Sequence, residues 1–431
     1  MKVLMFGWEF PPHIAGGLGT ACYGIVKGLA CNGVQTLFVM PSASGDEDRS
    51  AATIINASDV AVQHVSASVD DFVDKVKLLR VQSSLIPYTD PEEYRQMAEN
   101  ETRRQELAFS KQIGEKFKFS GRYGPNLLEE VARYAMVGGT IAREHQDEFD
   151  VIHAHDWLTY MAGIAAKELT GKPLVVHVHA TSFDRGTLEQ IDSRVYDIER
   201  RGMEAADRVV AVSDFTRNIV VNRYGIPPGK VVTVHNAVDF SGRENFEVER
   251  GVRDKVVTFL GRITFQKGPE YFIEAAAKVL KRTEHVRFVM AGSGDMMNRC
   301  IRQVARLGIS DRFHFTGFLR GADVQKMFAL SDVYIMPSVS EPFGISPLEA
   351  MRSNVPAIIS HQSGASEVLK YAFKVDFWDV DAMADDIYAL LNYPALARFS
   401  AENGYEEVNR LKWNNAAAKL KSIYESVINE K

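Results

Sequence analysis

The second half of the chain constrains the fold most, because short apolar runs alternate there with helical patterns. The runs are VVTFLG, VRFVMAG, FHFTGF, VYIMPS and PAIIS, with a less regular one in AFKVDF. Between them, stretches such as PEYFIEAAAKVLKR and MNRCIRQVARLG place apolar residues at helical spacing. Continuous apolar strands that alternate with helices predict a parallel sheet with helices on both faces.

The first half shows the same alternation, in VLMF, VQTLFVM, DVIHAHDW, PLVVHVHA, RVVAVS and VVTVHNAV. Residues 42–150 are charged, contain few clear strands, and are predicted to be helical from about residue 91 onward. We therefore expect an α/β protein of two doubly wound, Rossmann-like domains that face a central cleft. The first would span residues 1–243 and be completed by a C-terminal helix over 405–431. The second would span residues 244–404, after the polar stretch DFSGRENFEVERGVRDK.

Composition argues against several classes of protein. Of the 431 residues, 46% are hydrophobic and 25% are charged, the balance of a soluble globular protein. The net charge of −6 argues against a nucleic-acid partner, because a phosphate backbone requires a basic face. No run approaches the ~18 uninterrupted apolar residues of a membrane span, so stable membrane insertion is not expected. The three cysteines have an odd count and no metal-ligand spacing, which favours a cytoplasmic location.

The stretch SEPFGISPLEAM carries two glutamates around a turn that opens a predicted helix. Glu341 follows the predicted strand VYIM, at the rim of the sheet, where no helix cap explains it. Gly344 would let a ligand approach the backbone, and the N–H groups of Ile345 and Ser346 would favour an anion. The turn is therefore a candidate site for a negatively charged ligand.

The second glutamate, Glu349, also has a structural interpretation. Ser346, Pro347 and Glu349 have the pattern of a helix start, with Ser as the N-cap, Pro at the first helical position and Glu completing a capping box. From these residues alone, the capping role is favoured over a ligand-binding role.

The loop LGRITFQKG places two cations between a predicted strand and a predicted helix. Arg262 and Lys267 at this position suit a diphosphate, although a pair of solvated surface cations is the alternative. The glycine turns AGGLG (15–19) and AGSGD (291–295) are weaker signals, because neither has the full fingerprint of a dinucleotide site. Each either lines the ligand site or is only a tight connection.

Two pairs of histidines end predicted strands, in HAHDW and HVHA. A zinc site would require both pairs to converge, and cysteines with metal spacing are absent, so no metal is expected. We expect His179 to reach the cleft and donate to substrate hydroxyls, whereas packing in the core is the alternative for His153 and His177. The D-x-D pairs at residues 46–48 and 379–381 resemble metal pairs of sugar-nucleotide enzymes, but solvated loops explain them better.

Taken together, the motifs resemble a retaining glycosyltransferase of the two-Rossmann GT-B fold, close to the glycogen and starch synthases. The most specific element is E-x7-E, here Glu341 to Glu349. Four further motifs support it: HDW, VSDFT, VHNAVD, and GR followed by QKG. All occur in the family's order, and the resemblance covers nearly the whole chain. The resemblance implies a nucleotide diphosphate sugar as donor, a glycan as acceptor, and no divalent metal or other cofactor.

The resemblance also implies roles for individual residues. Arg262 and Lys267 would hold the diphosphate, Glu341 the hydroxyls of the transferred sugar, and His179 the region of the reacting carbon. Glu349 would bind the ribose. Retention is expected to proceed with the leaving phosphate assisting attack on the same face, without a dedicated base. The implied donor-binding residues are Gly16, Gly17, Gly344, Ile345, Ser346 and Glu349, and the implied acceptor-side residues are Glu9, His155 and Asp156.

One position departs from the family pattern. Bacterial glycogen and starch synthases carry K-x-G-G-L, whereas this chain has Ile14 in place of the lysine, which leaves the donor nucleotide open between UDP-glucose and ADP-glucose. The predicted function is transfer of glucose to an α-1,4-glucan. The alternatives are transfer of a hexose to another glycan or polysaccharide precursor, a sugar phosphorylase on the same fold, and a non-catalytic binder. The sequence leaves acceptor chain length, oligomeric state and the role of residues 42–150 open.

Overall fold

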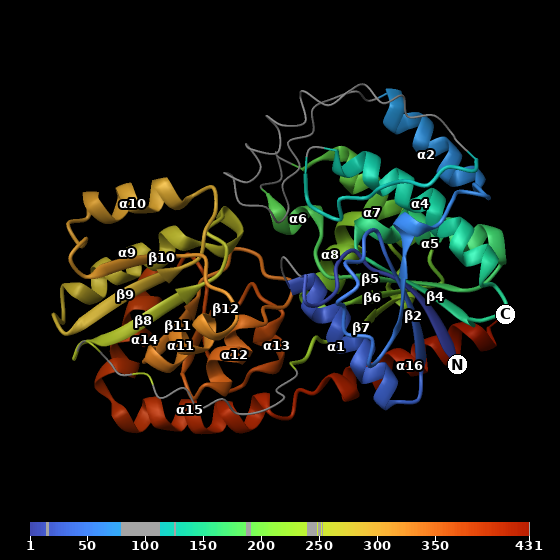
Figure 1. The fold of residues 1–431 in the computed structure, drawn as a ribbon. Helices are drawn as coiled ribbons and strands as arrows, with labels where there is room; N and C mark the ends of the chain where they lie inside the picture. The colour runs from blue at the N-terminus through green and yellow to red at the C-terminus, as the bar shows by residue number, and fades with distance from the viewer. Residues whose placement is uncertain are drawn as a thin grey trace. The chain divides into compact units, whose positions relative to one another are not determined.

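The computed structural model describes residues 1–13, 17–78, 113–124, 126–186, 191–238, 248, 251 and 253–430. The chain divides into two compact units, each with its own sheet (Figure 1). Unit 1 comprises Met1–Ala237 and Trp413–Lys431, and unit 2 comprises Val238–Lys412. Most of the predicted linker lies outside the described residues, as do Ile14 and Gly16.

Unit 1 is built on a seven-stranded sheet in the order β3-β2-β1-β4-β5-β6-β7, in which every pairing is parallel. The six predicted strands are present, and β3 is an addition that the sequence pattern did not indicate. The strands are β1 (Lys2–Phe6), β2 (Gln35–Met40), β3 (Thr53–Asn56), β4 (Val151–His155), β5 (Leu174–Val178), β6 (Arg208–Ala211) and β7 (Val231–Thr233).

Helices cover both faces of this sheet, and α8 shows how the sequence sets the ends of one of them. In α8 the hydroxyl of Ser213 accepts from the Thr216 N–H, and the helix ends at Gly225 in the left-handed conformation. The C-terminal helix α16 packs against α1 within the same unit. Within the segment that was hard to interpret, 79–112 lies outside the described residues. The helices are α1 (Gly17–Cys31), η1 (Ala57–Asp59), α2 (Ala67–Leu78), α4 (Leu127–Glu144), α5 (Trp157–Thr170), α6 (Ser182–Arg185), α7 (Ser193–Ala205), α8 (Asp214–Tyr224), η3 (Pro228–Lys230) and α16 (Trp413–Asn429).

Unit 2 is built on a six-stranded, all-parallel sheet in the order β10-β9-β8-β11-β12-β13. All six predicted strands are present, including the less regular one. The strands are β8 (Lys255–Leu260), β9 (Val286–Ala291), β10 (Phe313–Gly317), β11 (Val333–Met336), β12 (Ala357–Ser360) and β13 (Phe373–Val375). The helices are η4 (Phe265–Lys267), α9 (Pro269–Leu280), α10 (Met297–Arg306), α11 (Ala322–Leu330), α12 (Ser346–Arg352), α13 (Ala365–Val368), α14 (Val380–Asn392) and α15 (Pro394–Val408).

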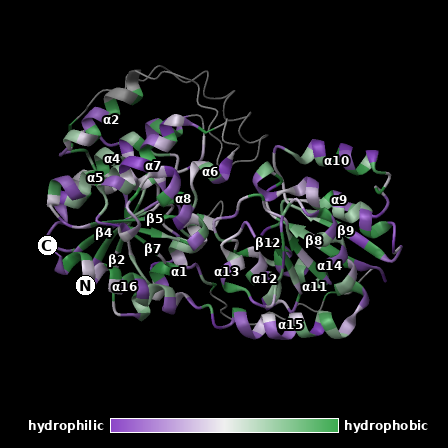
Figure 2. Cartoon of the chain, turned by 180° about the vertical axis from the view of Figure 1, so that it is seen from behind, coloured by the Kyte–Doolittle hydropathy of each residue, from purple (hydrophilic) through white to green (hydrophobic). Residues whose placement is uncertain are grey.

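The central strands read as unbroken apolar runs because helices bury both of their faces. Every residue of β4, β5, β11 and β12 is buried, whereas the edge strands β3 and β10 are only partly so. Hydrophobic residues accordingly gather on the strands and hydrophilic ones on the outward faces of the helices (Figure 2). In the part of the chain that the structure describes, no helix is long and apolar enough to cross a membrane.

The strand orders define one favoured ligand position in each unit. In unit 2 the chain leaves β8 toward β9 on one side and leaves β11 toward β12 on the other, so the order reverses between β8 and β11. In unit 1 the reversal falls between β1 and β4. Doubly wound sheets bind ligands outside the carboxyl ends of the strands at such a reversal. The loops that follow these four strands contain most of the predicted site residues.

Candidate active site

Lys267 and Glu341 form an ion pair between the loops that follow β8 and β11. The Lys267 ammonium contacts Oε2 of Glu341, and their side chains are 18% and 9% exposed. Ser338, in the same loop as Glu341, places its hydroxyl 3.4 Å from the same carboxylate oxygen. Two residues predicted from separate motifs are thus brought together at the reversal point of unit 2.

The backbone at Gly268 makes this approach possible. Gly268 has φ 63°, and a Cβ there would lie 2.0 Å from the carbonyl oxygen of Pro337, which follows β11. Only a residue without a side chain lets the β8 loop come this close to the β11 loop. The glycine of QKG is therefore needed for the two loops to come close enough for the Lys267–Glu341 pair.

Arg262 lies in the same loop as Lys267. Its guanidinium donates to Oε1 of Gln266 over 3.2 Å, and the side chain is half-buried. The AGSGD turn packs against this loop through backbone hydrogen bonds. The Ile263 N–H donates to the Ser293 carbonyl over 2.8 Å, and the Met296 N–H donates to the Ile263 carbonyl over 3.0 Å.

The turn before α12 differs from the predicted capping box. The helix begins at Ser346 with Ile345 as its N-cap residue, and no side chain caps it. The predicted capping box is therefore wrong, because Ser346 is the first residue of the helix rather than its N-cap. Glu349 is half-buried, and burial raises the pKa of its carboxyl.

Gly344 fixes the shape of the same turn. It has φ 92°, and a Cβ there would lie 3.1 Å from Cγ of Glu341 and 3.0 Å from Cε of Met336. The backbone of Glu341 is held by its N–H to the Gln362 carbonyl (2.9 Å) and by the Gly364 N–H to its own carbonyl (3.0 Å). The carboxylate of Glu341 is thus presented from a rigid loop.

In unit 1, Glu9 lies between β1 and α1. Its Oε1 accepts from the Gly19 N–H at 3.2 Å and lies 3.5 Å from the Tyr123 hydroxyl, in a buried position. Gly17 is the first residue of α1. A carboxylate at a helix N-terminus is electrostatically favourable, so Glu9 stabilises the start of α1 whatever else it binds.

The four histidines of HAHDW and HVHA form one cluster. The β4–β5 register sets His155 beside His177, and alternation along each strand brings His153 and His179 to the same face. Ring centroids lie 4.2 Å apart for His153–His155, 4.3 Å for His177–His179 and 5.1 Å for His155–His179. Both histidine pairs therefore converge, a condition that the sequence could not establish.

The members of this cluster differ in exposure and in hydrogen bonding. His153, His155 and His177 are fully buried, whereas His179 is half-buried. Nδ1 of His155 lies 2.9 Å from Nε2 of His179, and Nδ1 of His153 lies 2.7 Å from the Tyr424 hydroxyl. Burial lowers the pKa of His179 to about 3, so its imidazole is neutral at physiological pH. The burial of His153 and His177 agrees with the alternative that these two histidines pack in the core.

Asp156 supports the backbone at His179. Its Oδ1 accepts from the His179 N–H (2.7 Å) and from the Ala180 N–H (3.3 Å). It has φ 57°, a conformation that non-glycine residues rarely adopt and that is concentrated at functional sites. Burial raises the pKa of the Asp156 carboxyl to about 7. His155 and Asp156 are both fully buried, so in this structure they contact the loop at His179 rather than solvent.

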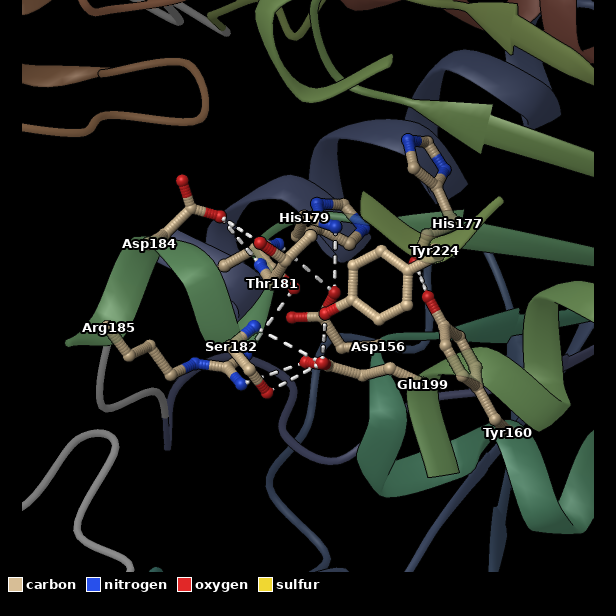
Figure 3. A network of polar contacts seen from close by, with 11 residues as sticks. Asp156, Tyr160, His177, His179, Thr181, Ser182, Asp184, Arg185, Glu199 and Tyr224 are labelled. Atoms are coloured by element: carbon tan, nitrogen blue, oxygen red, sulfur yellow. Dashed lines mark hydrogen bonds and ion pairs between the residues drawn. The ribbon is translucent and has the colours of Figure 1, made fainter. Parts of the chain in front are cut away.

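A polar network after β5 was not anticipated from the sequence (Figure 3). The Asp184 carboxylate accepts from the Thr181 N–H (2.7 Å) and hydroxyl (2.8 Å), which closes a capping box on α6. The buried Glu199 accepts from the Ser182 hydroxyl (2.6 Å) and pairs with Arg185 (3.1 Å). The T-x-x-D pattern directly after HVHA was the signal that could have predicted the Thr181–Asp184 capping box.

The acidic pairs have structural partners. Asp48 bonds the Tyr23 hydroxyl, which lowers the pKa of the Asp48 carboxyl to about 2. Asp379 accepts from the Ala382 N–H at 3.0 Å as the N-cap of α14, and Asp381 pairs with Lys278. A capping role and ion pairing, rather than simple solvation, account for the second pair.

Comparison with known proteins adds to this geometry. Residues 242–407 match the family model described as glycosyl transferases group 1, and residues 102–241 match the model described as glycosyltransferase family 4. With two parallel, doubly wound sheets, these matches identify the chain as a glycosyltransferase of the GT-B type.

Three distant matches extend over nearly the whole chain. An uncharacterized glycosyltransferase of Methanocaldococcus jannaschii is 27% identical over 98% of this chain and 98% of its own. A glycogen synthase of Mycobacterium tuberculosis is 22% identical over 98% of this chain and 94% of its own. Among solved structures, Anabaena HepE in complex with UDP and glucose has a TM-score of 0.66, with 17% identity over 99% of this chain and 100% of its own.

Proposed function

We propose that the protein is a retaining glucosyltransferase that moves glucose from a nucleoside diphosphate to a glycan, of which an α-1,4-glucan is the first candidate. The observation that carries this proposal is the pair of Lys267 and Glu341 at the reversal point of the unit 2 sheet. A sugar diphosphate has an anionic part and a part rich in hydroxyls. A cation beside a carboxylate can bind both, because the cation pairs with the diphosphate and the carboxylate accepts from the hydroxyls. The distant likeness to a glycogen synthase and to HepE with UDP and glucose supports the choice of substrates.

In this proposal Lys267 and Arg262 bind the diphosphate. As the bond from the sugar to the phosphate breaks, negative charge grows on the leaving phosphate, and two cations fixed beforehand stabilise it without reorganisation. The Lys267 side chain is already held by its ion pair with Glu341, so little side-chain freedom is lost when the donor binds.

Glu341 in the proposal accepts from hydroxyls of the transferred glucose. Its carboxylate is mostly buried, and in a water-poor position a hydrogen bond to a charged acceptor orients a hydroxyl strongly. Glu349 would bind the ribose, and the backbone at Gly344, Ile345 and Ser346 would approach the donor.

His179 and Glu9 in unit 1 are proposed to contact the sugar and the acceptor, respectively. His179 is half-buried and neutral, so a ring N–H can donate to a sugar hydroxyl or a ring nitrogen can accept. The buried His155 and Asp156 are proposed as positioning residues, which act through His179. With retention, the proton of the attacking hydroxyl passes to the leaving phosphate on the same face of the sugar.

The test is nucleotide release by the purified protein with UDP-glucose, ADP-glucose, GDP-mannose and UDP-N-acetylglucosamine, each with and without glycogen and with a chelator. We expect glycogen-dependent release from one glucose donor that the chelator leaves unchanged, and a product with the anomeric configuration of the donor. Donor hydrolysis that glycogen does not stimulate would move the acceptor to another glycan. Turnover of glucose 1-phosphate alone would indicate a phosphorylase and contradict the proposal.

A further inference from the structure

A cysteine that the sequence pattern did not connect to any motif lies beside the histidine cluster. Cys22, in α1, is fully buried, and its sulfur lies with one ring nitrogen each of His155 and His179 in a group whose ligand atoms are all within 4.8 Å of one another. These residues come from three separate elements, so only the fold brings them together. A thiolate and two imidazoles are the ligand types that zinc prefers.

The distances in this group are near those of a bound cation. Nδ1 of His155 and Nε2 of His179 already lie 2.9 Å apart. A tetrahedral zinc ion with bonds of about 2.0–2.3 Å separates its ligand atoms by roughly 3.3–3.6 Å. A small opening of the hydrogen-bonded pair would therefore admit the ion.

The hydrogen bonding of the cluster is incomplete among the described residues. If one proton lies between His155 and His179, either His179 Nδ1 or His155 Nε2 carries a second proton. Neither atom has a hydrogen-bond partner among the described residues, and both are buried. In either tautomer one buried N–H is thus left without an acceptor in this part of the structure, which native proteins seldom tolerate.

A cation bound to both inner nitrogens would leave a proton on each outer nitrogen, His155 Nε2 and His179 Nδ1. One ring nitrogen each of His153, His155 and His177 lies in a second group whose atoms are all within 4.8 Å of one another. His177 has no hydrogen-bond partner on either ring nitrogen among the described residues, and as a neutral imidazole it offers one acceptor. An outer partner for a ligating histidine is the usual arrangement in metal sites.

The charges around Cys22 favour a cation as well. The buried carboxylates of Glu9 and Asp156 act electrostatically on its thiol, and Oδ2 of Asp156 is buried without a partner among the described residues. His179 is the half-buried member of the group and follows β5 at the carboxyl end of the sheet.

We propose that Cys22, His155 and His179 form a binding site for one zinc ion or a similar divalent transition metal, and that occupancy of this site inhibits the enzyme. Binding requires loss of the thiol proton, which is released to solvent as the sulfur–metal bond forms. Inhibition follows because the metal takes the ring nitrogen of His179, and this second part alone rests on the proposed function.

The test uses cobalt(II) as the probe and the full-length protein after dialysis against a chelator. We expect one equivalent of cobalt to bind with a thiolate-to-cobalt absorption band and the visible bands of a tetrahedral site, and zinc to displace it. Cys22→Ser and Cys22→Ala should abolish the thiolate band while circular dichroism stays native. Cys31→Ser, in the same helix but exposed, and Cys300→Ser, in unit 2, should keep it.

Activity is then measured with increasing zinc. We expect zinc to reduce turnover at least tenfold in the parent protein and in Cys31→Ser, and to have little effect on Cys22→Ser, whose turnover without zinc should match the parent. A cobalt spectrum without a thiolate band, or a band that survives in folded Cys22→Ser, would overturn the site. Tight binding at Cys22 without inhibition would leave the metal site standing and overturn the assignment of His179 to the sugar.

Discussion

Lys267 and Glu341 stand 74 positions apart in the chain, and their side chains meet as an ion pair outside the carboxyl ends of two neighbouring strands. Each neutralises the other where both are largely buried, so removing one leaves an uncompensated charge on its partner. The pair therefore links the stability of the two loops to the proposed donor site.

Replacement of either partner should reduce turnover far more than it perturbs the fold. Lys267→Ala should lower kcat by about 10²–10³-fold, the range seen when one preorganised transition-state group is removed. Glu341→Gln keeps the shape and should lower kcat/KM by a similar factor. Steady-state kinetics with the active donor is the measurement.

Lys255→Ala is the matched control for Lys267→Ala. Lys255 is the first residue of the same strand, β8, so it lies at the amino end of the strand, away from the proposed donor site. It pairs with Asp332 at 3.0 Å. It should keep near-parental kcat, and equal losses in the two lysine variants would show that the effect is one of general stability.

Gly268→Ala should be costly in both stability and activity. The added Cβ would meet the Pro337 carbonyl, and the positive φ is unfavourable for alanine. We expect a loss of about 2–4 kcal/mol in the free energy of unfolding, since strain and a steric clash add. Gly308→Ala has a similar φ of 70° with no atom within 4 Å of the new Cβ, and should lose only about 1 kcal/mol. Equal losses at the two positions would contradict the close approach of the loops.

The polar network after β5 predicts a variant whose loss of stability depends on pH. Burial raises the pKa of the Glu199 carboxyl, and the Arg185 cation opposes that shift. Arg185→Met should therefore destabilise the protein by about 3–5 kcal/mol at pH 8, because the buried Glu199 loses its cationic partner. A carboxyl whose folded pKa is raised binds more protons when folded, so the loss should shrink as the pH falls through that pKa toward the unfolded value near 4.5.

Urea unfolding at pH 8 and pH 5 measures this difference. Arg200→Met removes an exposed ion pair with Glu204 on α7 and should lose less than about 1 kcal/mol at both pH values. A loss for Arg185→Met that does not change with pH would mean that Glu199 is not the group responsible.

Asp386 on α14 offers a test in unit 2. Burial and the neighbouring charge of Asp385 raise the pKa of the Asp386 carboxyl to about 6. The ionised form therefore opposes folding above that pH, and Asp386→Asn should raise the midpoint of thermal unfolding at pH 8 by a few degrees, roughly 1–3 °C for a partly exposed group. The gain should vanish by pH 4. Asp385→Asn removes part of the repulsion on Asp386 but also an exposed pair with Arg282, so its gain should be smaller.

The strands were predictable where burial on both faces leaves an unbroken apolar run, as in β8, β9 and β11. The strand β3 was missed because it lies at the edge of its sheet and is only partly buried, so polar residues break its pattern. The predicted capping box is absent because α12 begins at Ser346 itself, so this serine is the first helical residue and not the N-cap.

The strand-end positions of Lys267 and Glu341 were predictable from the sequence, but the contact between them was not. Lys267 and Glu341 were each placed at a strand end, and parallel topology then brings such ends together. The convergence of four histidines depends on the register that pairs His155 with His177, and the place of Cys22 depends on how α1 packs. Both are long-range consequences of packing that no local spacing encodes.

The most direct test of the proposed donor site is calorimetric titration of UDP and ADP into the parent protein, Lys267→Ala and Lys255→Ala. The diphosphate that supports turnover should bind the parent and Lys255→Ala with the same affinity, and should bind Lys267→Ala at least tenfold more weakly. Uridine or adenosine alone should not distinguish the three proteins. Equal diphosphate affinity in all three would contradict the assignment of Lys267, and with it the placement of the donor outside β8 and β11.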